Sequence, residues 1–245
     1  MSRLSGRGTA LVVAAALALS GCSQLQRIGD SLGSSDVDLL AAVSLTEADA
    51  APSSTFQPYE GGTEVFGRTS LDLCYGDFPS EDLRSGRNQV GIGDEAGTAW
   101  VSSEAVLYPT PEDAEQAMSE LEKAREECPS EPVEPPQPGR DELAWEFLPD
   151  PDADWPQQPG ITRQAYEFQA TNPAGESFTS TATYLQRGRM ILALYTTPPT
   201  SPAAVLRNAP DQARFVEVMT NRLAGLPEDP LQYGEPLDDP NDISV

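Results

Sequence analysis

The chain has 245 residues, with 39 acidic against 15 basic side chains and a net charge of −24. A molecule of this sign repels the phosphate backbone, which excludes nucleic acid as a partner. The chain contains no histidine, and this excludes Ser-His and Cys-His nucleophiles together with histidine zinc sites.

The first 21 residues have the pattern of an export signal peptide. Two arginines and no acid precede the apolar run from Thr9 to Leu19, which is shorter than the about 20 residues that span a bilayer. Leu19-Ser20-Gly21-Cys22 resembles the lipobox of bacterial lipoproteins; an ordinary secretory signal is the alternative. The resemblance implies cleavage between Gly21 and Cys22. It also implies lipid (diacylglyceryl and palmitate) on Cys22, which anchors the protein at the extracytoplasmic face of the cell membrane.

Removal of the signal peptide takes away two of the 15 basic residues and no acid, so the mature chain has a net charge of −26. Besides Cys22, the mature chain keeps Cys74 and Cys128. Because export places them in an oxidising compartment, we predict that they form a disulfide. A metal or redox pair would need further ligands or a Cys-x-x-Cys spacing, and the sequence has neither.

The mature chain divides by composition into three parts. Residues 22–38 are small and polar, which predicts a lipidated flexible tether. Residues 39–226 have the length and pattern of a single extracytoplasmic domain, and residues 227–245 form an acidic tail predicted to be disordered. The apolar spacing from Asp36 to Leu45 favours a short amphipathic helix, either docked on the domain or simply preceding it.

Two strands and a helix are predicted in the first half of the domain. Alternation favours a short strand at 71–75, carrying Cys74, and a second one at 98–108. Thr110 can cap a helix that runs to about Glu127. Its apolar positions recur at spacings of three and four and continue to Cys128. They are Ala114, Ala117, Met118, Leu121 and Ala124. The disulfide would therefore connect the buried face of this helix to the strand that holds Cys74.

Residues 129–160 contain nine prolines, which predicts a long surface excursion with one short structured piece at 142–148. This excursion is a candidate rim of a binding site. Three strands and a closing helix follow, predicted at 161–171, 178–186, 190–197 and 211–224. The fold class is therefore α+β, a mostly antiparallel sheet packed with two main helices and one disulfide.

Few residues offer catalysis. Ser119 and Lys123 are spaced as neighbours on a helix, but they are better explained as surface residues. Gly91-Ile-Gly93 lacks the rest of a dinucleotide-binding fingerprint. Paired carboxylates are the remaining catalytic groups, and no particular pair is indicated. We predict no catalytic residue, no cofactor and no enzymatic activity.

An acidic segment and the tryptophans are further candidates for ligand binding. Asp150-Pro-Asp-Ala-Asp154 resembles the opening of an EF-hand loop, but Trp155 and Ile161 stand where that loop requires glycine and glutamate. We therefore predict a plain acidic loop and no metal site. Trp145 and Trp155 could line a ligand groove, whereas Trp100 is predicted to lie in the core.

The layout resembles the PknH-like extracellular sensor domains of actinobacteria. The resemblance rests on the cysteine in Leu71-Asp-Leu-Cys-Tyr75, on the strand and Ala-rich helix from Val101 to Cys128, and on the later hairpin through Arg187-Gly-Arg-Met-Ile-Leu192. It implies helices on an antiparallel sheet with a cleft for a ligand. That family usually has two disulfides, whereas only one can form here, and no ligand-binding residues can be transferred.

These observations favour a membrane-anchored extracytoplasmic lipoprotein with a non-catalytic ligand-binding or sensor-type domain. Its partners would be the membrane, through lipid on Cys22, and a small ligand or envelope protein of unknown identity. The alternative is an envelope adaptor or structural lipoprotein that acts through protein contacts, and a carboxylate-based hydrolase is the third hypothesis. A ligand-binding domain should show a partly apolar pocket with convergent polar groups, and an adaptor should show a flat apolar patch.

Overall fold

The computed structural model describes residues 35–52, 54–93, 99–135, 142–151, 155, 157–196 and 212–232. The predicted signal peptide, the cleavage site at Gly21 and Cys22, and the lipidation site lie outside the described residues. So do most of the tether, residues 136–141 of the Pro-rich excursion, and the chain from residue 233 onward. Within the described ranges, no helix is long and apolar enough to cross a membrane.

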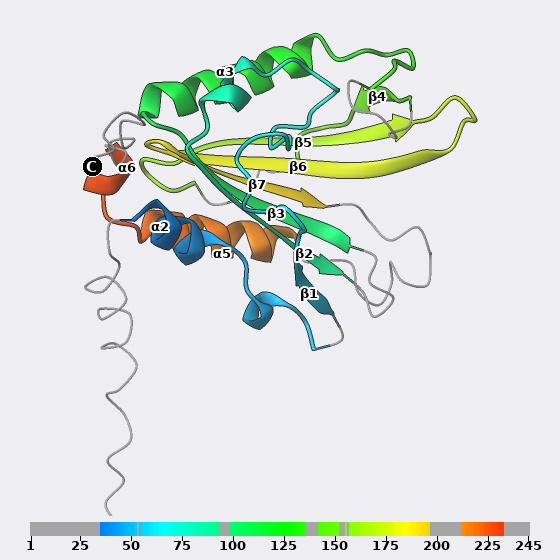
Figure 1. Ribbon diagram of the computed structural model, residues 1–245. Helices are drawn as coiled ribbons and strands as arrows, with labels where there is room; N and C mark the ends of the chain where they lie inside the picture. The colour runs from blue at the N-terminus through cyan, green and yellow to red at the C-terminus, as the bar shows by residue number, and fades with distance from the viewer. Residues whose placement is uncertain are drawn as a thin grey trace, which may run out of the picture. The chain divides into compact units, whose positions relative to one another are not determined.

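The domain is built on one seven-stranded sheet in which every neighbouring pair is antiparallel (Figure 1). The strand order is β1-β2-β3-β7-β6-β5-β4, so β3 and β7 join an N-terminal part of the sheet to a C-terminal part. This confirms the predicted α+β class. The strands are β1 Thr55–Pro58, β2 Gly86–Gly93, β3 Ala99–Leu107, β4 Ala144–Phe147, β5 Thr162–Thr171, β6 Ser177–Arg187 and β7 Met190–Thr196.

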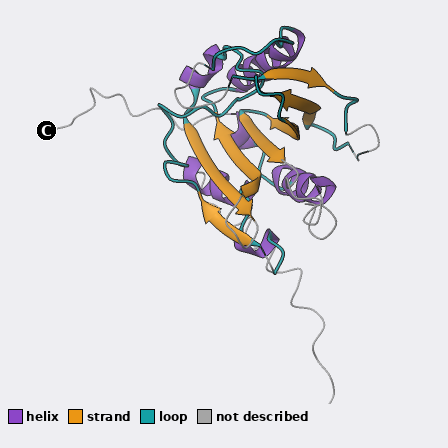
Figure 2. Ribbon diagram, turned by 90° about the vertical axis from the view of Figure 1, so that its right-hand side faces the viewer, coloured by secondary structure: helices purple, strands orange, loops and turns teal. Residues whose placement is uncertain are grey.

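Helices cover both faces of the sheet (Figures 1 and 2). Helices α2 (Asp36–Val43) and α5 (Gln212–Ala224) pack on one face, and α3 (Pro111–Glu126) packs on the other. Successive residues of a strand point to opposite faces. On β3, accordingly, Val101 and Ala105 belong to the core under α2 and α5, whereas Val106 belongs to the core under α3.

Helix α3 begins and ends where the sequence predicts. The Thr110 hydroxyl accepts a hydrogen bond from the Asp113 amide at 3.2 Å, and the Asp113 carboxylate accepts one from the Thr110 amide at 3.2 Å. This reciprocal capping box satisfies two amides that lack helical partners. The predicted apolar stripe is buried: Ala114, Ala117, Met118, Leu121 and Ala124.

Helix α2 docks on the domain through Leu39, Leu40 and Val43, all of which are buried. Its first residue, Asp36, pairs with Arg189, whose side chain is fully buried in the turn between β6 and β7. Arg189 also donates hydrogen bonds to the Tyr108 carbonyl at 3.0 Å and to the Pro230 carbonyl at 2.7 Å. One guanidinium thus holds α2, the end of β3 and the C-terminal segment together.

Two differences from the sequence predictions concern the C-terminal end of the domain and strands β1 and β2 at one edge of the sheet. The segment predicted as tail from residue 227 contains α6 (Asp229–Gln232), whose Leu231 is 1% exposed, so the structured domain extends to Gln232. Strands β1 and β2 were not predicted. Their polar and glycine-containing sequences, TFQP and GRNQVGIG, lack the apolar alternation that marks a half-buried strand.

The predicted strand at 71–75 is wrong. Cys74 has φ 57° and Tyr75 has φ 54°, which places both residues in the left-handed region and turns the chain instead of extending it. The segment belongs to a long loop, residues 59–78, between β1 and the short helix η2 (Pro79–Leu83). This segment is called the covering loop below. A second short helix, η1, spans Glu47–Asp49.

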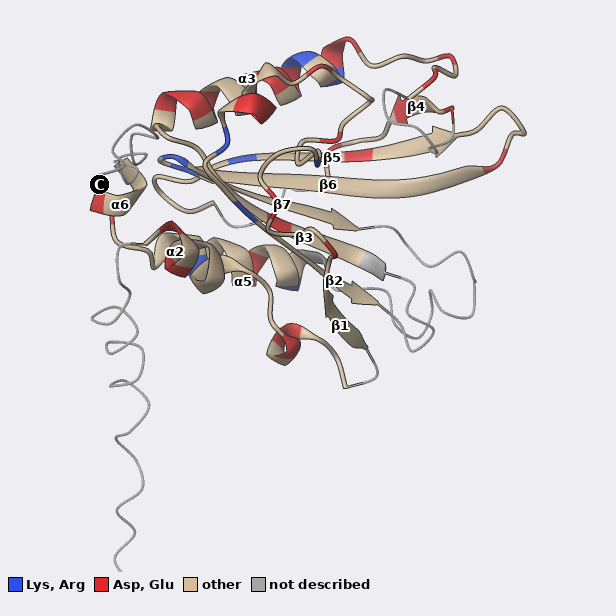
Figure 3. Cartoon of the chain, viewed as in Figure 1, with Lys and Arg blue, Asp and Glu red and all other residues tan. Residues whose placement is uncertain are grey.

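Charged residues are distributed unevenly over the fold (Figure 3). Acidic residues are frequent along α3, on the surface of the molecule, whereas arginines occur within strands β2, β5 and β6. Of these, Arg87 on β2 is 4% exposed. A buried guanidinium requires a partner, and Arg87 finds it in the region described next.

Candidate functional site

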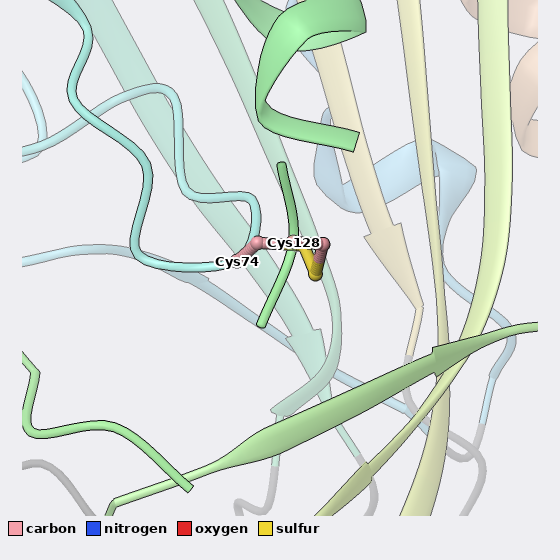
Figure 4. The surroundings of a disulfide bond; sticks show 2 residues. All are labelled: Cys74 and Cys128. Carbon is pink, nitrogen blue, oxygen red and sulfur yellow. A yellow bond between two sulfur atoms is a disulfide. The ribbon is translucent and has the colours of Figure 1, made fainter. Parts of the chain in front are cut away.

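The covering loop is fixed by the disulfide between Cys74 and Cys128, whose Cα atoms are 5.3 Å apart (Figure 4). The predicted disulfide is therefore confirmed. It joins the covering loop to Cys128, two residues after the end of α3, and it does not involve a strand. The loop is in this way attached to the helix that covers the same face of the sheet.

A cavity of about 390 Å³ lies at the covering loop, on the face of the sheet that carries α3. It is called the aromatic cavity below. The sheet contributes side chains from six strands and the segment before β4, and the loop contributes the rest. The described lining consists of Gln89, Ser102, Glu104, Leu143, Trp145, Phe168, Phe178, Ser180 and Tyr195, with Tyr59, Thr69, Ser70, Asp72, Cys74 and Tyr75 from the loop.

Glu104 forms the polar wall of the cavity together with two partners. Its carboxylate oxygen Oε1 is the acceptor for Arg87 Nε and for Ser70 Oγ. The side chains of Glu104 and Arg87 are 1% and 3% exposed. Arg87 also donates to the Gly61 carbonyl at 3.0 Å and to Gln89 Oε1 at 2.8 Å, so this arginine links the sheet to the covering loop.

A second ion pair, between the buried Arg84 and the partly buried Glu81, supports the same part of the covering loop. Arg84 Nη2 lies 3.2 Å from Glu81 Oε2, and it donates to the Arg68 carbonyl at 2.7 Å. The Glu81 carboxylate accepts hydrogen bonds from the backbone amides of Ser70 and Leu71, both at 2.9 Å. Two arginines and two glutamates therefore balance in charge, and together they hold residues 68–71 of the covering loop.

Burial shifts the acidity of these carboxyl groups. Desolvation raises the pKa of Glu104 above its usual range, and the nearby Arg87 guanidinium and the Ser70 hydroxyl oppose this rise only in part. Desolvation raises the pKa of Glu81 as well, against the charge of Arg84. The cavity wall thus contains a glutamate that takes up a proton more readily than an exposed glutamate does.

Aromatic rings form another part of the cavity lining. The rings of Tyr75 and Trp145 meet edge to face, with centroids 4.7 Å apart and planes at 89°. The Tyr195 hydroxyl donates to the Ser70 carbonyl at 3.0 Å, and it lies 3.0 Å from the Tyr184 hydroxyl. Burial raises the pKa of Tyr195 well above its usual value, so this phenol remains neutral at physiological pH.

The tryptophans singled out in the sequence occupy different places. Trp145 lines the aromatic cavity, as a groove residue would. Trp155 lies on the other face of the sheet, where Arg163 stacks 5.6 Å from its ring and a smaller cavity of about 200 Å³ adjoins α5. The side chain of Trp100 lies outside the described residues, so its predicted core position stays a prediction.

The other singled-out residues are not brought together at the cavity. Ser119 is exposed on α3 and donates to the Glu115 carbonyl at 3.0 Å, and Lys123 lies 3.9 Å from Glu127 at the surface. Gly91 and Gly93 lie in β2. Asp150 pairs with Arg125 at 3.0 Å, and residues 152–154 of the acidic loop lie outside the described residues.

The residues of the polar wall were not predicted from the sequence. A usable signal was present, because Ser102 and Glu104 alternate with Val101 and Ala105 in a predicted strand, and alternation places them on one face. Arg87 carried no such signal, since β2 itself was not predicted. In the part of the chain that the structure describes, no group of three or more His, Cys, Asp or Glu residues is arranged to hold a metal ion.

No protein-family model and no curated protein sequence matches this chain. Among solved structures, the chain is similar to the extracellular domain of PknH from Mycobacterium tuberculosis, with 13% identity, a TM-score of 0.42, and coverage of 75% of this chain and 96% of that one. An uncharacterized protein from Mycobacterium smegmatis shows 11% identity, a TM-score of 0.41, and coverage of 80% and 99%. Similarity at this level says nothing about a ligand, and the fold class rests on the sheet topology itself.

Proposed function

We propose that this protein is a membrane-anchored extracytoplasmic lipoprotein whose domain binds a small ligand in the aromatic cavity without catalysing a reaction. The observation that carries the proposal is the cavity. Its volume of about 390 Å³ falls in the range of about 300–1,000 Å³ that is typical of small-molecule sites. Aromatic rings and a few convergent polar groups line it, which is the composition that gives both affinity and orientation.

Two observations support the extracytoplasmic location. The domain contains the Cys74–Cys128 disulfide. Disulfides are stable in oxidising compartments and are rare in the cytosol. The lipobox pattern that ends at Cys22 supplies the corresponding export route and a lipid anchor. Two or more acyl chains on Cys22 would hold the domain at the membrane, because a single chain binds only weakly and reversibly.

The absence of catalysis is supported by the chemistry of the lining. Histidine is missing from the whole chain, which removes the most common general base. Glu104 is engaged by Arg87 and Ser70 on one carboxylate oxygen, and Ser70 in turn accepts a hydrogen bond from Arg84. These contacts hold the wall in place, and they engage the Ser70 hydroxyl and one carboxylate oxygen of Glu104, which are the groups that a nucleophile or base would supply.

The adaptor hypothesis has less support. It predicts a contiguous apolar patch at the surface. The large apolar side chains that are more than about a third exposed, among those described, come from four different segments, namely α2, the covering loop, η2 and β6; they are Val37, Phe66, Leu83 and Phe178. Phe178 also lines the aromatic cavity, so one of the four is explained by the site itself.

Co-purification tests the binding function with the full lipoprotein. Protein extracted from its native envelope in mild detergent is analysed by native mass spectrometry, in wild-type form and as Ser102→Trp and Ser119→Trp. Ser102 lines the cavity, whereas Ser119 is exposed on α3. We expect a bound small molecule in the wild type and in Ser119→Trp, and its loss in Ser102→Trp. Wild-type protein without a bound molecule, or equal occupancy in both variants, would contradict the proposal.

The anchor is tested separately, by mass spectrometry of the N-terminal peptide and by membrane fractionation. We expect a mature chain that begins at a lipid-modified Cys22 and sediments with the membrane. Cys22→Ala should remain uncleaved or leave the membrane fraction. An unmodified Cys22 in a soluble secreted product would contradict the lipoprotein assignment and leave the cavity proposal standing.

A further inference from the structure

The sheet side of the aromatic cavity changes from polar to aromatic across the strands. The order of the contributing strands is β2-β3-β7-β6-β5-β4. The lining residues of β2 and β3 are polar, namely Gln89, Ser102 and Glu104, and those of β5 and β4 are aromatic, namely Phe168 and Trp145. Between them, Tyr195 of β7 stands directly opposite Ser102. A ligand that lies along the sheet therefore meets hydrogen-bonding groups at one end and rings at the other.

Both acidic residues of the lining are already engaged. Glu104 accepts hydrogen bonds from Arg87 and Ser70, and Asp72 interacts with a partner as well. An anionic ligand would compete with Glu104 for Arg87, and a cationic ligand would compete with Arg87 for Glu104. In either case a buried charge would lose part of its compensation. A neutral ligand leaves this pair intact, so the wall favours a molecule without net charge.

The neutral polar groups of the lining favour hydroxyl groups on the ligand. Ser102 Oγ accepts a hydrogen bond from Gln89 Nε2 at 3.2 Å. A hydroxyl group offers one donor and two acceptor positions, and an amide nitrogen offers two donors, so both side chains can make further hydrogen bonds. An entirely apolar ligand would displace water from them without replacing its hydrogen bonds, which is unfavourable. The ligand therefore needs polar groups along one edge.

Aromatic rings occur on the loop side of the cavity as well. Tyr59 packs against β2 where Gly91 has no side chain, because a Cβ on Gly91 would lie 3.0 Å from Cε2 of Tyr59. Tyr75 meets Trp145 edge to face, with centroids 4.7 Å apart. Rings therefore line the cavity near β2 as well as near β4. A pyranose sugar fits such a mixed lining, because its hydroxyl groups project from the edge of the ring while its C–H groups form two apolar faces.

We propose that the ligand is a neutral carbohydrate, a pyranoside with equatorial hydroxyl groups, which hydrogen-bonds to Ser102 and Gln89 and packs a C–H face against Trp145. Equatorial hydroxyl groups leave both faces of the sugar uninterrupted, so its apolar contact with the aromatic rings is complete. This inference deepens the binding function proposed above and depends on it. A cyclic alcohol would use the rings without the polar groups, and a short open-chain polyol would use the polar groups without the rings. The pyranoside uses both.

Four matched probes test this assignment: methyl β-glucoside, its analogues with an ammonium or a carboxylate group at carbon 6, and cyclohexanol. The three sugars differ only at that carbon, and cyclohexanol keeps the ring size without the other hydroxyl groups. Binding to the full lipoprotein is measured by ligand-observed NMR at pH 7, in a detergent without a sugar headgroup and against empty micelles. Salt at about 0.15 M screens long-range attraction by the acidic surface. We expect methyl β-glucoside to bind about tenfold more tightly than each of the other probes.

Variants then assign the binding to the aromatic cavity. Phe178 and Phe66 are 38% and 68% exposed, so either ring can be removed with little effect on folding, and of the two it is Phe178 that lines the cavity. Phe178→Ala and Ser102→Ala should each weaken the binding of methyl β-glucoside several-fold. Phe66→Ala and Ser119→Ala are the matched controls and should leave it unchanged.

Several results would overturn the carbohydrate inference. One is equal or tighter binding of either charged analogue or of cyclohexanol. Others are the absence of binding by methyl β-glucoside, and equal effects of the cavity variants and their controls. A co-purified molecule that is not a sugar, and that is lost only in Ser102→Trp, would overturn this inference and leave the binding function standing.

Discussion

Arg87 on β2 and Glu104 on β3 form an ion pair in which both side chains are at least 97% buried. The pair lies diagonally across two neighbouring strands, because Glu104 is directly opposite Gln89. Its position places a charged group inside the wall of the aromatic cavity and connects that wall to the covering loop through Gly61. The stability of the domain and the shape of its site therefore depend on the same contact.

Replacement of Arg87 by methionine should be strongly destabilising. It would remove the cationic partner of the buried Glu104 carboxyl group, and the loss of one partner of a buried pair costs about 3–5 kcal/mol. The measurement is the free energy of unfolding in urea at pH 7. Lys123→Met is the control, because Lys123 and Glu127 are 69% and 68% exposed and such pairs contribute about 0–1 kcal/mol. Equal losses for the two variants would contradict the importance of the buried pair.

The raised pKa of Glu104 predicts a specific pH dependence. The folded protein binds this proton more tightly than the unfolded chain does, so the contribution of Glu104 to stability is largest at low pH. It is lost as the pH rises from the usual glutamate value of 4.5 through the folded pKa. The stability advantage of the wild type over Glu104→Gln should therefore shrink between pH 4 and pH 8 in urea titrations. Glu81 titrates in both proteins, so its effect largely cancels. An advantage that grows with pH would show that Arg87 outweighs burial.

Loss of the disulfide should destabilise the domain and release the covering loop. Cys74 and Cys128 are 54 residues apart, and closing a loop of this length stabilises the folded state by about 4 kcal/mol. The double variant Cys74→Ala, Cys128→Ala should unfold at lower urea concentration than the oxidised wild type. Dithiothreitol should lower the wild-type midpoint and leave the double variant unchanged. A double variant as stable as the oxidised protein would contradict this account.

Two glycines in hairpin turns provide a matched test of the C-terminal packing. Gly175 and Gly188 both have positive φ, at 82° and 54°, but only the latter is crowded: a Cβ on Gly188 would lie 2.3 Å from the Leu231 carbonyl oxygen. Near Gly175, no described atom lies within 4 Å of such a Cβ. Gly175→Ala should cost about 1–2 kcal/mol from the left-handed backbone alone.

Gly188→Ala should cost more, because it also displaces α6. Faster hydrogen exchange at the Arg189 amide, which donates to the Leu231 carbonyl at 2.9 Å, would report that displacement directly. Equal stabilities of the two variants, with unchanged exchange at Arg189, would show that α6 is not held at this turn.

The sequence predicted those parts of the fold that carry a periodic pattern. Helix α3 was predicted from Thr110 and the apolar stripe, and β5, β6 and β7 were predicted from alternation and turn residues, each to within a few positions. The cysteine pairing followed from the number of cysteines and the compartment. In each case the local signal and the tertiary packing favour the same structure.

The rest depended on contacts that are distant in sequence. Strand β2 is held by its neighbours β1 and β3, and its residues Arg87 and Gln89 are polar because they face the cavity network. The segment around Cys74 has the alternation of a strand, but the disulfide and the contact of Tyr75 with Trp145 hold it in a left-handed turn. The identity of Glu104 as a wall residue required the register of β3 against β2, which a single sequence does not contain.

The sheet has two halves, β1-β2-β3 and β7-β6-β5-β4, which meet along the ladder between β3 and β7. Both carboxylates of the cavity, on Asp72 and Glu104, belong to the half before α3, whereas Trp145, Phe168 and Phe178 belong to the half after it. A ligand that contacts side chains from both halves would link the two halves across the β3–β7 ladder. The domain should then unfold more cooperatively with the ligand bound than without it. The bound ligand would in this way stabilise strands of the sheet that it does not contact.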